Sequence, residues 1–318
     1  MAFLNATDLT TNLRQNWKAG LTVSLISIPL SVSLAVASQS TPLAGIITAI
    51  WAGLFAALFG GSHFNIVGPT GALSGLLASY AIIHGAGALS SLAIVAGLII
   101  LISYVLKLQK YLVFIPANTV HGFTLGVAFI IAFGQLNFAL GINGLTKHER
   151  FISNLFESIT HISQGSLFAT AVFILFLGGL FVLRGIVPKI PGAILLAPIG
   201  ILLGYASSRG YLPMTVDTLA TKYTDIHPSI IAIPNFTFSS EIIVPAFAVA
   251  IVAILETMIS AKIADSMTGT KHDKQKEMLG LGLANIVSGL AGGIPATAAL
   301  ARTSLNIKSG GTHKTAAA

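Results

Sequence analysis

The chain of 318 residues is 54% hydrophobic and only 8% charged, and its mean hydropathy is +0.86. Because a soluble domain carries about 25% charged residues, this composition excludes an ordinary soluble domain and predicts a polytopic membrane protein. The absence of cysteine excludes disulfide bonds, thiolate chemistry and cysteine-based metal sites. The formal charge of +7 does not indicate a nucleic-acid partner, because the basic residues are scattered in short loops between apolar runs.

The first predicted element is a polar cytoplasmic segment, residues 1–17, read as a short surface helix that ends near Trp17 and Lys18. No cleavable signal is apparent, so the first apolar run is expected to remain as a membrane span. Ten spans are predicted in all, at about 18–38, 42–59, 63–83, 88–106, 117–138, 166–183, 191–207, 241–262 and 277–291, with a tenth that ends near Ser309.

Two polar stretches lie between these spans. Residues 146–164 are charged and predict an amphipathic surface helix. Residues 208–240 contain Pro213, Pro228 and Pro234 and are expected to form a loop outside the membrane.

The distribution of basic residues predicts the orientation of the chain. With the N-terminus in the cytoplasm, twelve fall inside, namely Arg14, Lys18, Lys107, Lys110, Arg184, Lys189, Lys262, Lys271, Lys274, Lys276, Lys308 and Lys314. Four fall outside, namely Lys147, Arg150, Arg209 and Lys222. This bias follows the positive-inside rule and predicts a multi-pass protein of the inner, or plasma, membrane with a cytoplasmic N-terminus.

Two short motifs break the third and the tenth span. GGSHFNIVGPTGAL covers residues 60–73, and GGIPATAAL covers residues 292–300. In each, a Gly-Gly pair ends an apolar helix, a short extended piece with a proline follows, and small residues begin a new helix. A helix that begins inside the membrane directs unpaired N–H groups and the positive end of its dipole into the bilayer.

The two breaks also indicate an inverted repeat. Seven spans form one unit, so a second unit would enter the membrane from the opposite face, and broken helices in corresponding positions are a pointer to a transporter binding site. The alternative is a pair of unrelated Gly/Pro kinks, which membrane helices tolerate. Only three spans of the second unit are present, so the chain is expected to be incomplete and to need the missing part for function.

Glu256 is the strongest candidate for chemistry, because it lies about fifteen residues into the eighth span. A carboxylate at mid-span costs roughly 2.5–3.5 kcal/mol on insertion scales, so such residues usually serve ion or proton pathways. The alternative is a structural Glu satisfied by a neighbouring helix. Ser260 lies one turn further on the same face and could add a hydroxyl ligand for a coupling cation.

Arg302 is the one basic residue placed well within a span, and its guanidinium suits oxyanions. The alternative is an ion pair with Glu256 that merely makes both charges tolerable. Thr70 and Thr297 are expected to head the two half-helices, either as part of an anion cradle or as simple N-caps. The substrate site is completed by Gly71, Ala298, Ala299, Leu300, Ala301 and, less strongly, Ser31 of the first span.

The eight histidines show no metal-ligand spacing, and no nucleophile elbow, P-loop or dinucleotide fingerprint is present. The sequence therefore predicts a transporter that is no enzyme and has no cofactor other than a coupling Na⁺ or H⁺.

Four stretches carry a resemblance to a known family: AGLTVSLISIPLSVSLAVAS, FAALFGGSHFNIVGPTGAL, NIKSGGTHKT and, most specifically, the block ETMISAKIADSMTGTKHDKQKEMLGLGLANIVSGLAGGIPATAALART. Over its whole length the chain resembles the SulP family of anion transporters, which includes sulfate, bicarbonate and dicarboxylate carriers and the animal relatives pendrin and prestin.

The resemblance implies an all-α fold of fourteen spans in two inverted repeats of seven, shared with the uracil permeases, in which about ten spans are present here. Residues 18–110 and 241–318 would form its core domain, and residues 111–207 would form its gate domain. Residues 208–240 would form an extracytoplasmic loop. Spans 11–14 and a cytoplasmic STAS domain would be missing. The family also implies a homodimer, an elevator-type movement of the core against the gate, an anion site at Thr70 and the 298–302 backbone, and a coupling ion at Glu256 and Ser260. Because Glu256 stands where a sodium-coupled bicarbonate carrier has Asp, proton coupling is at least as plausible as sodium coupling.

The expected function is therefore cation-coupled secondary transport of sulfate, bicarbonate or a small dicarboxylate across a lipid bilayer. The alternatives are an uncoupled exchanger or channel-like conduit, a truncated paralogue that does not transport, and a nucleobase carrier of the same fold, against which Arg302 argues.

Overall fold

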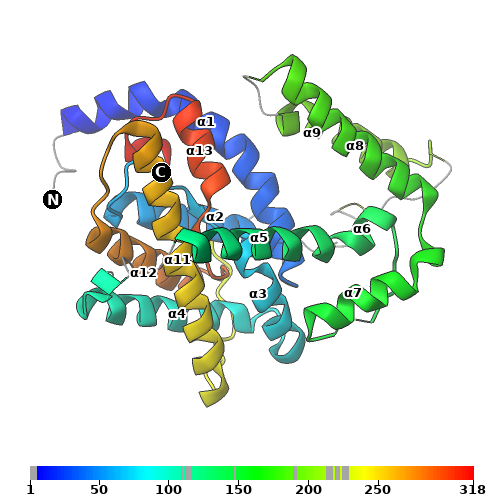
Figure 1. Cartoon of the computed structure of the whole chain (residues 1–318), viewed down its shortest axis with the longest axis horizontal. Coiled ribbons are helices and arrows are strands. Elements are labelled where there is room, and N and C mark those ends of the chain that lie inside the picture. Colours follow the sequence, from blue (N-terminus) through cyan, green and yellow to red (C-terminus); the bar gives the residue numbers. More distant parts are fainter. Residues whose placement is uncertain are drawn as a thin grey trace. The chain divides into compact units, whose positions relative to one another are not determined.

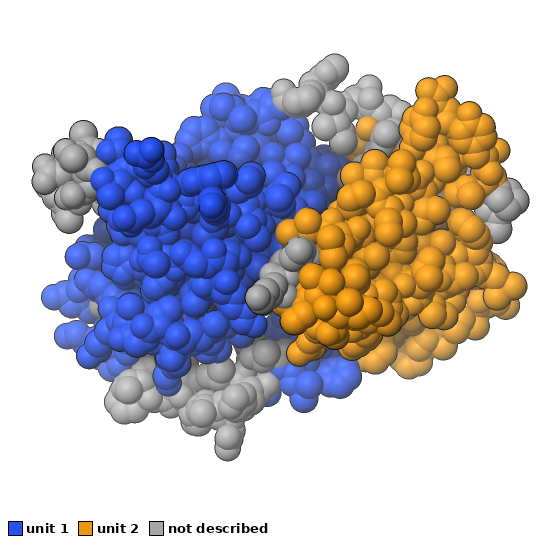
Figure 2. All heavy atoms as spheres, turned by 90° about the horizontal axis from the view of Figure 1, so that it is seen from above, with its two compact units in different colours: residues 1–131, 229–318 blue, residues 132–228 orange. Residues whose placement is uncertain are grey.

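A computed structural model describes residues 6–108, 110–111, 117–146, 148–188, 192–212, 218, 223 and 229–318. The described chain is mostly helical and divides into two compact units (Figures 1 and 2). Unit 1 consists of residues 1–131 and 229–318, and unit 2 of residues 132–228. The predicted loop at 208–240 lies partly outside the described residues, including Pro213 and Pro228.

The N-terminal helix α1 runs without a break from Ala6 to Ala37. The prediction of a separate surface helix ending near Trp17 and Lys18 was therefore wrong. No glycine or proline interrupts the chain between Ala6 and Ala19, so the polar turns continue directly into the apolar ones. Asn16, in the polar part, is fully buried and accepts hydrogen bonds from the N–H groups of Thr312 and His313. The N-terminal turns of α1 are thus part of unit 1.

The first broken span follows α2, which comprises Pro42–Phe59. Thr41 caps its start with a hydrogen bond from the N–H of Ala44, and extended Gly60 ends it. The chain then forms the two-residue strand β1 (Val67–Gly68) before α3 (Gly71–His84) and α4 (Ala88–Val105).

The second broken span has the same order of elements. After α11 (Ile243–Thr268) and α12 (Lys274–Leu290), strand β2 (Thr297–Ala298) leads into α13 (Leu300–Lys308). The two strands pair antiparallel, with Val67 opposite Ala298 and Gly68 opposite Thr297. Two segments far apart in the sequence therefore meet at their breaks, as the predicted repeat requires.

Buried polar side chains satisfy the extended backbone around β2. The N–H of Ile294 donates to Oγ1 of Thr48 (2.7 Å), and its carbonyl accepts from Oγ of Ser288 (3.0 Å). The side-chain amide of Asn285 bonds both the N–H (2.9 Å) and the carbonyl (3.0 Å) of Ala296. Since a bare peptide group in a bilayer costs several kcal/mol, these side chains are what allows a helix to stop at this depth.

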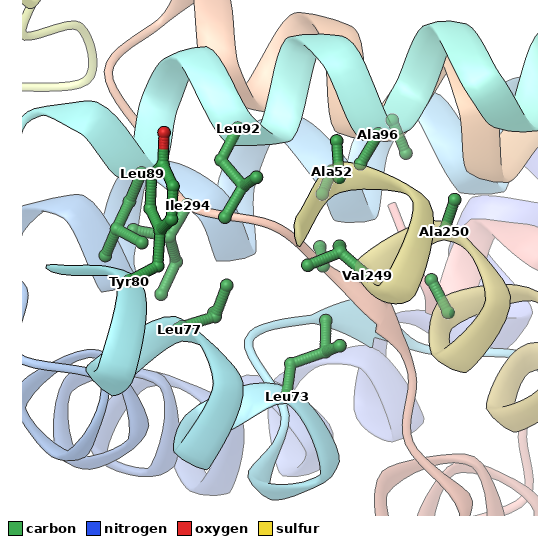
Figure 3. Packing of buried hydrophobic residues seen from close by; sticks show 14 of the residues in the cluster. Ala52, Leu73, Leu77, Tyr80, Leu89, Leu92, Ala96, Val249, Ala250 and Ile294 are labelled. Carbon is green, nitrogen blue, oxygen red and sulfur yellow. The ribbon is translucent and has the colours of Figure 1, made fainter. Parts of the chain in front are cut away.

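The core of unit 1 is built from small and branched apolar side chains. Leu73 and Leu77 of α3 lie with Leu89 and Leu92 of α4 and with Val249 of α11 in one buried cluster (Figure 3). Helix α12 packs against α2 and α4 (Figure 1).

Glycines allow the close approach of α12 to its neighbours. A Cβ atom at Gly280 would lie 2.5 Å from the nitrogen of Gly60, and one at Gly289 would lie 2.5 Å from the carbonyl oxygen of Ser90.

Unit 2 contains α6 (Leu136–Leu140), α7 (Phe151–Thr160), the 3₁₀ turn η2 (Ile162–Gln164), α8 (Leu167–Ile186) and α9 (Gly192–Ser208). Helix α5 (Ala117–Gly134) begins in unit 1 and ends in unit 2. The amphipathic helix predicted within 146–164 is α7, which exposes Ile152, Phe156 and Ile159.

Five described helical segments are long and apolar enough to cross a membrane: Thr10–Ala37, Pro42–Phe59, Ala88–Val105, Leu167–Ile186 and Ser240–Thr268. Three shorter apolar helices, Gly71–His84, Leu125–Leu140 and Gly192–Ser208, fall at other predicted spans. The chain is thus a multi-pass membrane protein. Eight of the ten predicted spans fall at these apolar helices, whereas the ninth and tenth fall at α12 and α13, which are not among them.

Candidate functional site

The N-terminus of α3 is capped by Thr70, as the sequence predicts. Its Oγ1 accepts a hydrogen bond from the N–H of Ala72 (3.3 Å) and donates to the carboxylate of Glu256 (2.9 and 3.1 Å). Since the first N–H groups of a helix have no partner within it, those of Gly71 and Leu73 remain available in the described structure. Thr70 is therefore both an N-cap and a link to the acid.

Thr297 occupies a different position from the predicted one. It lies in β2, and α13 starts only at Leu300, with Ala299 in the N-cap position and no side-chain cap. The prediction that Thr297 heads or caps the second half-helix was wrong, because pairing with β1 keeps Thr297 and Ala298 extended, and Ala299 takes the N-cap position instead. Its hydroxyl lies 3.2 Å from Oε2 of Glu256 and donates to it.

The amide groups expected to be exposed at Ala298 and Ala299 are also occupied. The N–H of Ala298 donates to Oγ1 of Thr257 (3.1 Å), and that of Ala299 donates to the carbonyl of Ile66 (3.2 Å). The available amide end of the second half-helix therefore begins at Leu300 and Ala301.

Glu256 of α11 joins the two breaks. Its half-buried carboxylate accepts hydrogen bonds from Thr70 of the first break and Thr297 of the second. One ionisable group is thus hydrogen-bonded to both crossing segments. Among the described residues no group of three or more His, Asp or Glu side chains could hold a metal ion.

Arg302 reaches from α13 to the first break. Its side chain is only 2% exposed, and one guanidinium nitrogen, Nη2, donates to the carbonyl of Pro69, the residue before the α3 cap. A Cβ at Gly68 would lie 2.6 Å from Nη1, so the guanidinium packs directly on the β1 backbone. Its Nε and Nη1 atoms are buried and have no described hydrogen-bond partner.

The ion pair with Glu256, the alternative role for Arg302, is not among the ion pairs of the described side chains. The arginine instead places a positive charge, with free donors, beside the N-terminus of α3.

Ser260 belongs to a second buried polar cluster. Its hydroxyl lies 2.9 Å from Oδ1 of Asn65 and 2.9 Å from Oγ1 of Thr303. The side-chain amide of Asn65 in turn donates to Oε1 of Glu277 (2.6 Å). Ser260 is therefore close in sequence to Glu256 but hydrogen-bonded elsewhere in the described structure.

Ser31 is fully buried on α1, and its hydroxyl has no described partner. Its carbonyl oxygen packs on Gly45 of α2. The α1 side chain that approaches the start of α3 is Leu34, whose Cδ2 would lie 3.8 Å from a Cβ at Gly71.

Sequence reasoning missed three residues that shape the site. Thr257 holds the N–H of Ala298, Asn65 links the first break to α11, and Glu277 of α12 accepts from the N–H groups of Gly61 and Ser62, both at 2.7 Å. Asn65 could have been noticed as the polar residue inside FNIVGPT. Glu277 stands beside Lys274 and Lys276 and reads as an ordinary surface charge.

The chain is similar to several known proteins. Residues 13–317 match the profile of the sulfate permease family. The chain is 35% identical to "Putative sulfate transporter YvdB" of Bacillus subtilis strain 168, over 92% of this chain and 55% of that protein. It is 28% identical to "Bicarbonate transporter BicA" of Picosynechococcus, over 94% of this chain and 54% of that protein. The chain thus spans about half the length of these curated relatives.

Solved structures show the same fold. The transmembrane domain of a cyanobacterial bicarbonate transporter BicA superposes with a TM-score of 0.83 at 24% identity, over 96% of this chain and 80% of that one. SLC26A9 gives a TM-score of 0.82 at 14% identity, over 99% of this chain and 53% of that one. These likenesses confirm the predicted all-α fold with two inverted repeats of seven spans, of which this chain holds only a part.

Proposed function

The chain belongs to the sulfate permease family, and from this premise we propose that it carries the anion site of a secondary transporter for sulfate, bicarbonate or a small dicarboxylate. The observation that supports this most strongly is the crossing of β1 and β2. At this crossing Thr70 and Thr297 both bond Glu256, and Arg302 bonds Pro69, which supports the inference that the amide ends of α3 and α13 serve one anion.

The proposed anion ligands are backbone amides and the arginine. Two helix N-termini offer N–H groups, at Gly71 and Leu73 in α3 and from Leu300 in α13, and the helix dipoles favour negative charge there. The Nε and Nη1 atoms of buried Arg302, which have no hydrogen-bond partner among the described residues, add charged donors. Such a set favours an oxyanion over a neutral nucleobase.

Glu256 is the proposed coupling group. A carboxylate held by two threonine hydroxyls beside an anion site can take up a proton, which removes the repulsion between acid and substrate. The same carboxylate could bind Na⁺ with nearby hydroxyl oxygens, among which Ser260 remains a candidate. An uncoupled exchanger is the second candidate, because the animal relatives include a "Sodium-independent sulfate anion transporter" of Bos taurus.

We place this site in an elevator-type transporter of the inner membrane, with a cytoplasmic N-terminus and a homodimeric assembly. Residues 18–110 and 241–318 would form the core domain, and residues 111–207 the gate domain, with residues 208–240 as the external loop. The existence of two compact units supports a division of this kind, although the observed division falls between residues 131 and 132, within α5, and not at residue 111.

The test is uptake of radiolabelled sulfate and bicarbonate into proteoliposomes that contain the protein, with an imposed proton or sodium gradient. We expect anion uptake in the wild type, driven by one of the two gradients. Glu256→Gln should abolish the dependence on that gradient, whereas Glu241→Gln, an exposed carboxylate ahead of the same helix, should not. Unchanged gradient dependence in Glu256→Gln would reject the coupling role of Glu256, whereas wild-type uptake that responds to neither gradient would favour the exchanger.

A further inference from the structure

One side of the α3 N-terminus faces helix α5. The two glycines on this face, Gly71 and Gly75, are one helical turn apart. A Cβ at Gly71 would lie 2.6 Å from Cγ1 of Ile131 and closer still to Cδ1, whereas a Cβ at Gly75 would lie 3.2 Å from Cγ2 of Ile130. Real Cβ atoms essentially never have neighbours below 3.0 Å, so Ile131 occupies the space that a side chain at Gly71 would need.

Ile131 lies next to the proposed ligand groups. Gly71 is the first residue of α3, follows the cap Thr70 and carries one of the available N–H groups. Leu34 of α1 approaches the same Gly71 position, at 3.8 Å. The amide end of α3 thus has apolar side chains from two helices beside it.

Ile131 is not an ordinary core residue. It is 37% exposed, although its tip fits closely over Gly71. An anion that approaches the Gly71 amide from this side would meet the aliphatic branch first. Stripping water from a charge against an apolar surface is costly, so the branch opposes entry for as long as it stays there.

We propose that Ile131 is the gating and size-selecting residue of the anion site. Its side chain on α5 covers Gly71, must move away to admit an anion to the α3 amide end, and limits the size of the anion accepted. This inference rests on the proposed function and adds a residue that composition and motif could not single out.

The first test compares Ile131→Ala with Ile130→Ala, a neighbouring isoleucine on the same helix that faces Gly75 instead. Uptake of bicarbonate and of the larger fumarate is measured in proteoliposomes. Ile131→Ala should raise the fumarate-to-bicarbonate ratio of kcat/KM by about tenfold, the size of effect expected when a few methyl groups leave a pocket wall. Ile130→Ala should leave the ratio unchanged. Equal ratios in the two variants would overturn the inference.

A suppressor experiment tests the contact itself. Gly71→Ala should lose most anion uptake because its new methyl group collides with Ile131, and Gly71→Ala/Ile131→Ala should regain it. Gly71→Ala/Ile130→Ala should not regain uptake. Wild-type uptake by Gly71→Ala alone, or rescue by both double variants, would show that Ile131 does not cover the site.

A readout without transport separates this inference from the proposed function. The chain has no cysteine, so Ile131→Cys and Ile130→Cys each introduce a single thiol. Sulfate or bicarbonate at saturating concentration should change the rate of maleimide labelling at position 131 and not at position 130. That result without any uptake would reject the transport proposal and support the gate. Uptake by the wild type, with anion-dependent labelling equal at positions 131 and 130, would support the transport proposal and reject the gating role of Ile131.

Discussion

The hydroxyl groups of Thr70 and Thr297, one from each broken span, donate hydrogen bonds to the same carboxylate, that of Glu256. The two threonines reach it in different ways. Thr70 does so from the N-cap of α3, and Thr297 does so from the strand that precedes α13. The two halves of the site are therefore similar in sequence but not equivalent in structure, because α3 has a side-chain cap and α13 has none.

Glu277 is predicted to hold the first break in place. It is 4% exposed and accepts from the N–H groups of Gly61 and Ser62 and from the amide of Asn65. Glu277→Ala would leave these donors buried and unpaired, so the free energy of unfolding should fall by about 3 kcal/mol. Thermal unfolding of the purified protein in detergent measures this effect. The exposed Glu241→Ala is the control, and an equal melting temperature in the two variants would contradict the assignment.

Exchanging the carboxylate of Glu277 and the amide of Asn65 provides a sharper test of the hydrogen bond between these two side chains. Glu277→Gln replaces one of the two acceptor oxygens by an NH2 group; when the remaining oxygen keeps the Gly61 and Ser62 N–H groups, the new NH2 donor faces the NH2 donor of Asn65. Asn65→Asp/Glu277→Gln restores one acceptor and one donor and should recover part of the lost melting temperature. A double variant less stable than both single variants would argue against a direct Asn65–Glu277 bond.

The Arg302 guanidinium is predicted to bind the anion as a planar group and not only as a charge. Arg302→Lys keeps the charge but loses the fork and the packing on Gly68, so sulfate affinity should fall by about tenfold or more. Gly68→Ala should weaken sulfate binding as well, because its Cβ would displace Nη1. Gly53→Ala is the matched control, since its Cβ meets only ordinary contacts from 3.5 Å. Equilibrium binding of radiolabelled sulfate measures the affinity of the three variants. Wild-type affinity in Arg302→Lys would contradict the prediction that the planar guanidinium binds the anion.

His313 is predicted to make stability depend on pH. It follows α13, and its ring packs near that of His63 at 5.7 Å between centroids. Burial lowers the pKa of His313 from its ordinary 6.5, and the positive charges of His63 and Lys314 lower it further. The unfolded chain then binds more protons than the folded one, so stability is complete above about pH 6.5 and falls as the pH drops below it.

Melting temperatures measured between about pH 8 and about pH 5 test this dependence. His313→Gln should lose less stability in acid than the wild type, whereas His84→Gln, at the end of α3, should follow the wild type. Identical pH profiles for His313→Gln and the wild type would show that His313 makes no contribution.

The sequence allowed the breaks to be predicted, because a Gly-Gly pair followed by proline within an apolar run has few other structural meanings. It allowed Thr70 to be predicted as a cap, because a threonine directly before small helix formers is a common helix start. Thr297 was misplaced because ATAAL is rich in the helix formers Ala and Leu, so the local signal favours a helix that starts directly after Thr297. The long-range pairing of Val67 with Ala298 overrides this preference, and no local signal reports that pairing.

Other residues escaped prediction for a similar reason. Glu277 lies in a charged stretch, and only its tertiary partners Gly61 and Ser62 distinguish it from a surface acid. Ile131 looks like any lipid-facing isoleucine until Gly71 is seen beneath it. Periodicity and punctuation therefore predict where helices begin and end, whereas the side chains that control access depend on contacts between distant segments.

The central claim is that the amide ends of α3 and α13 bind one anion at the crossing of the two breaks. The most direct measurement is the position of selenate, a heavier analogue of sulfate, by anomalous scattering from crystals of the protein. The account predicts one peak within hydrogen-bond distance of the N–H groups of Gly71 and Leu300 and beside Arg302. A selenate bound elsewhere in a protein that transports sulfate, or a Gly71 amide too far from Leu300 for one ion to reach both, would contradict it.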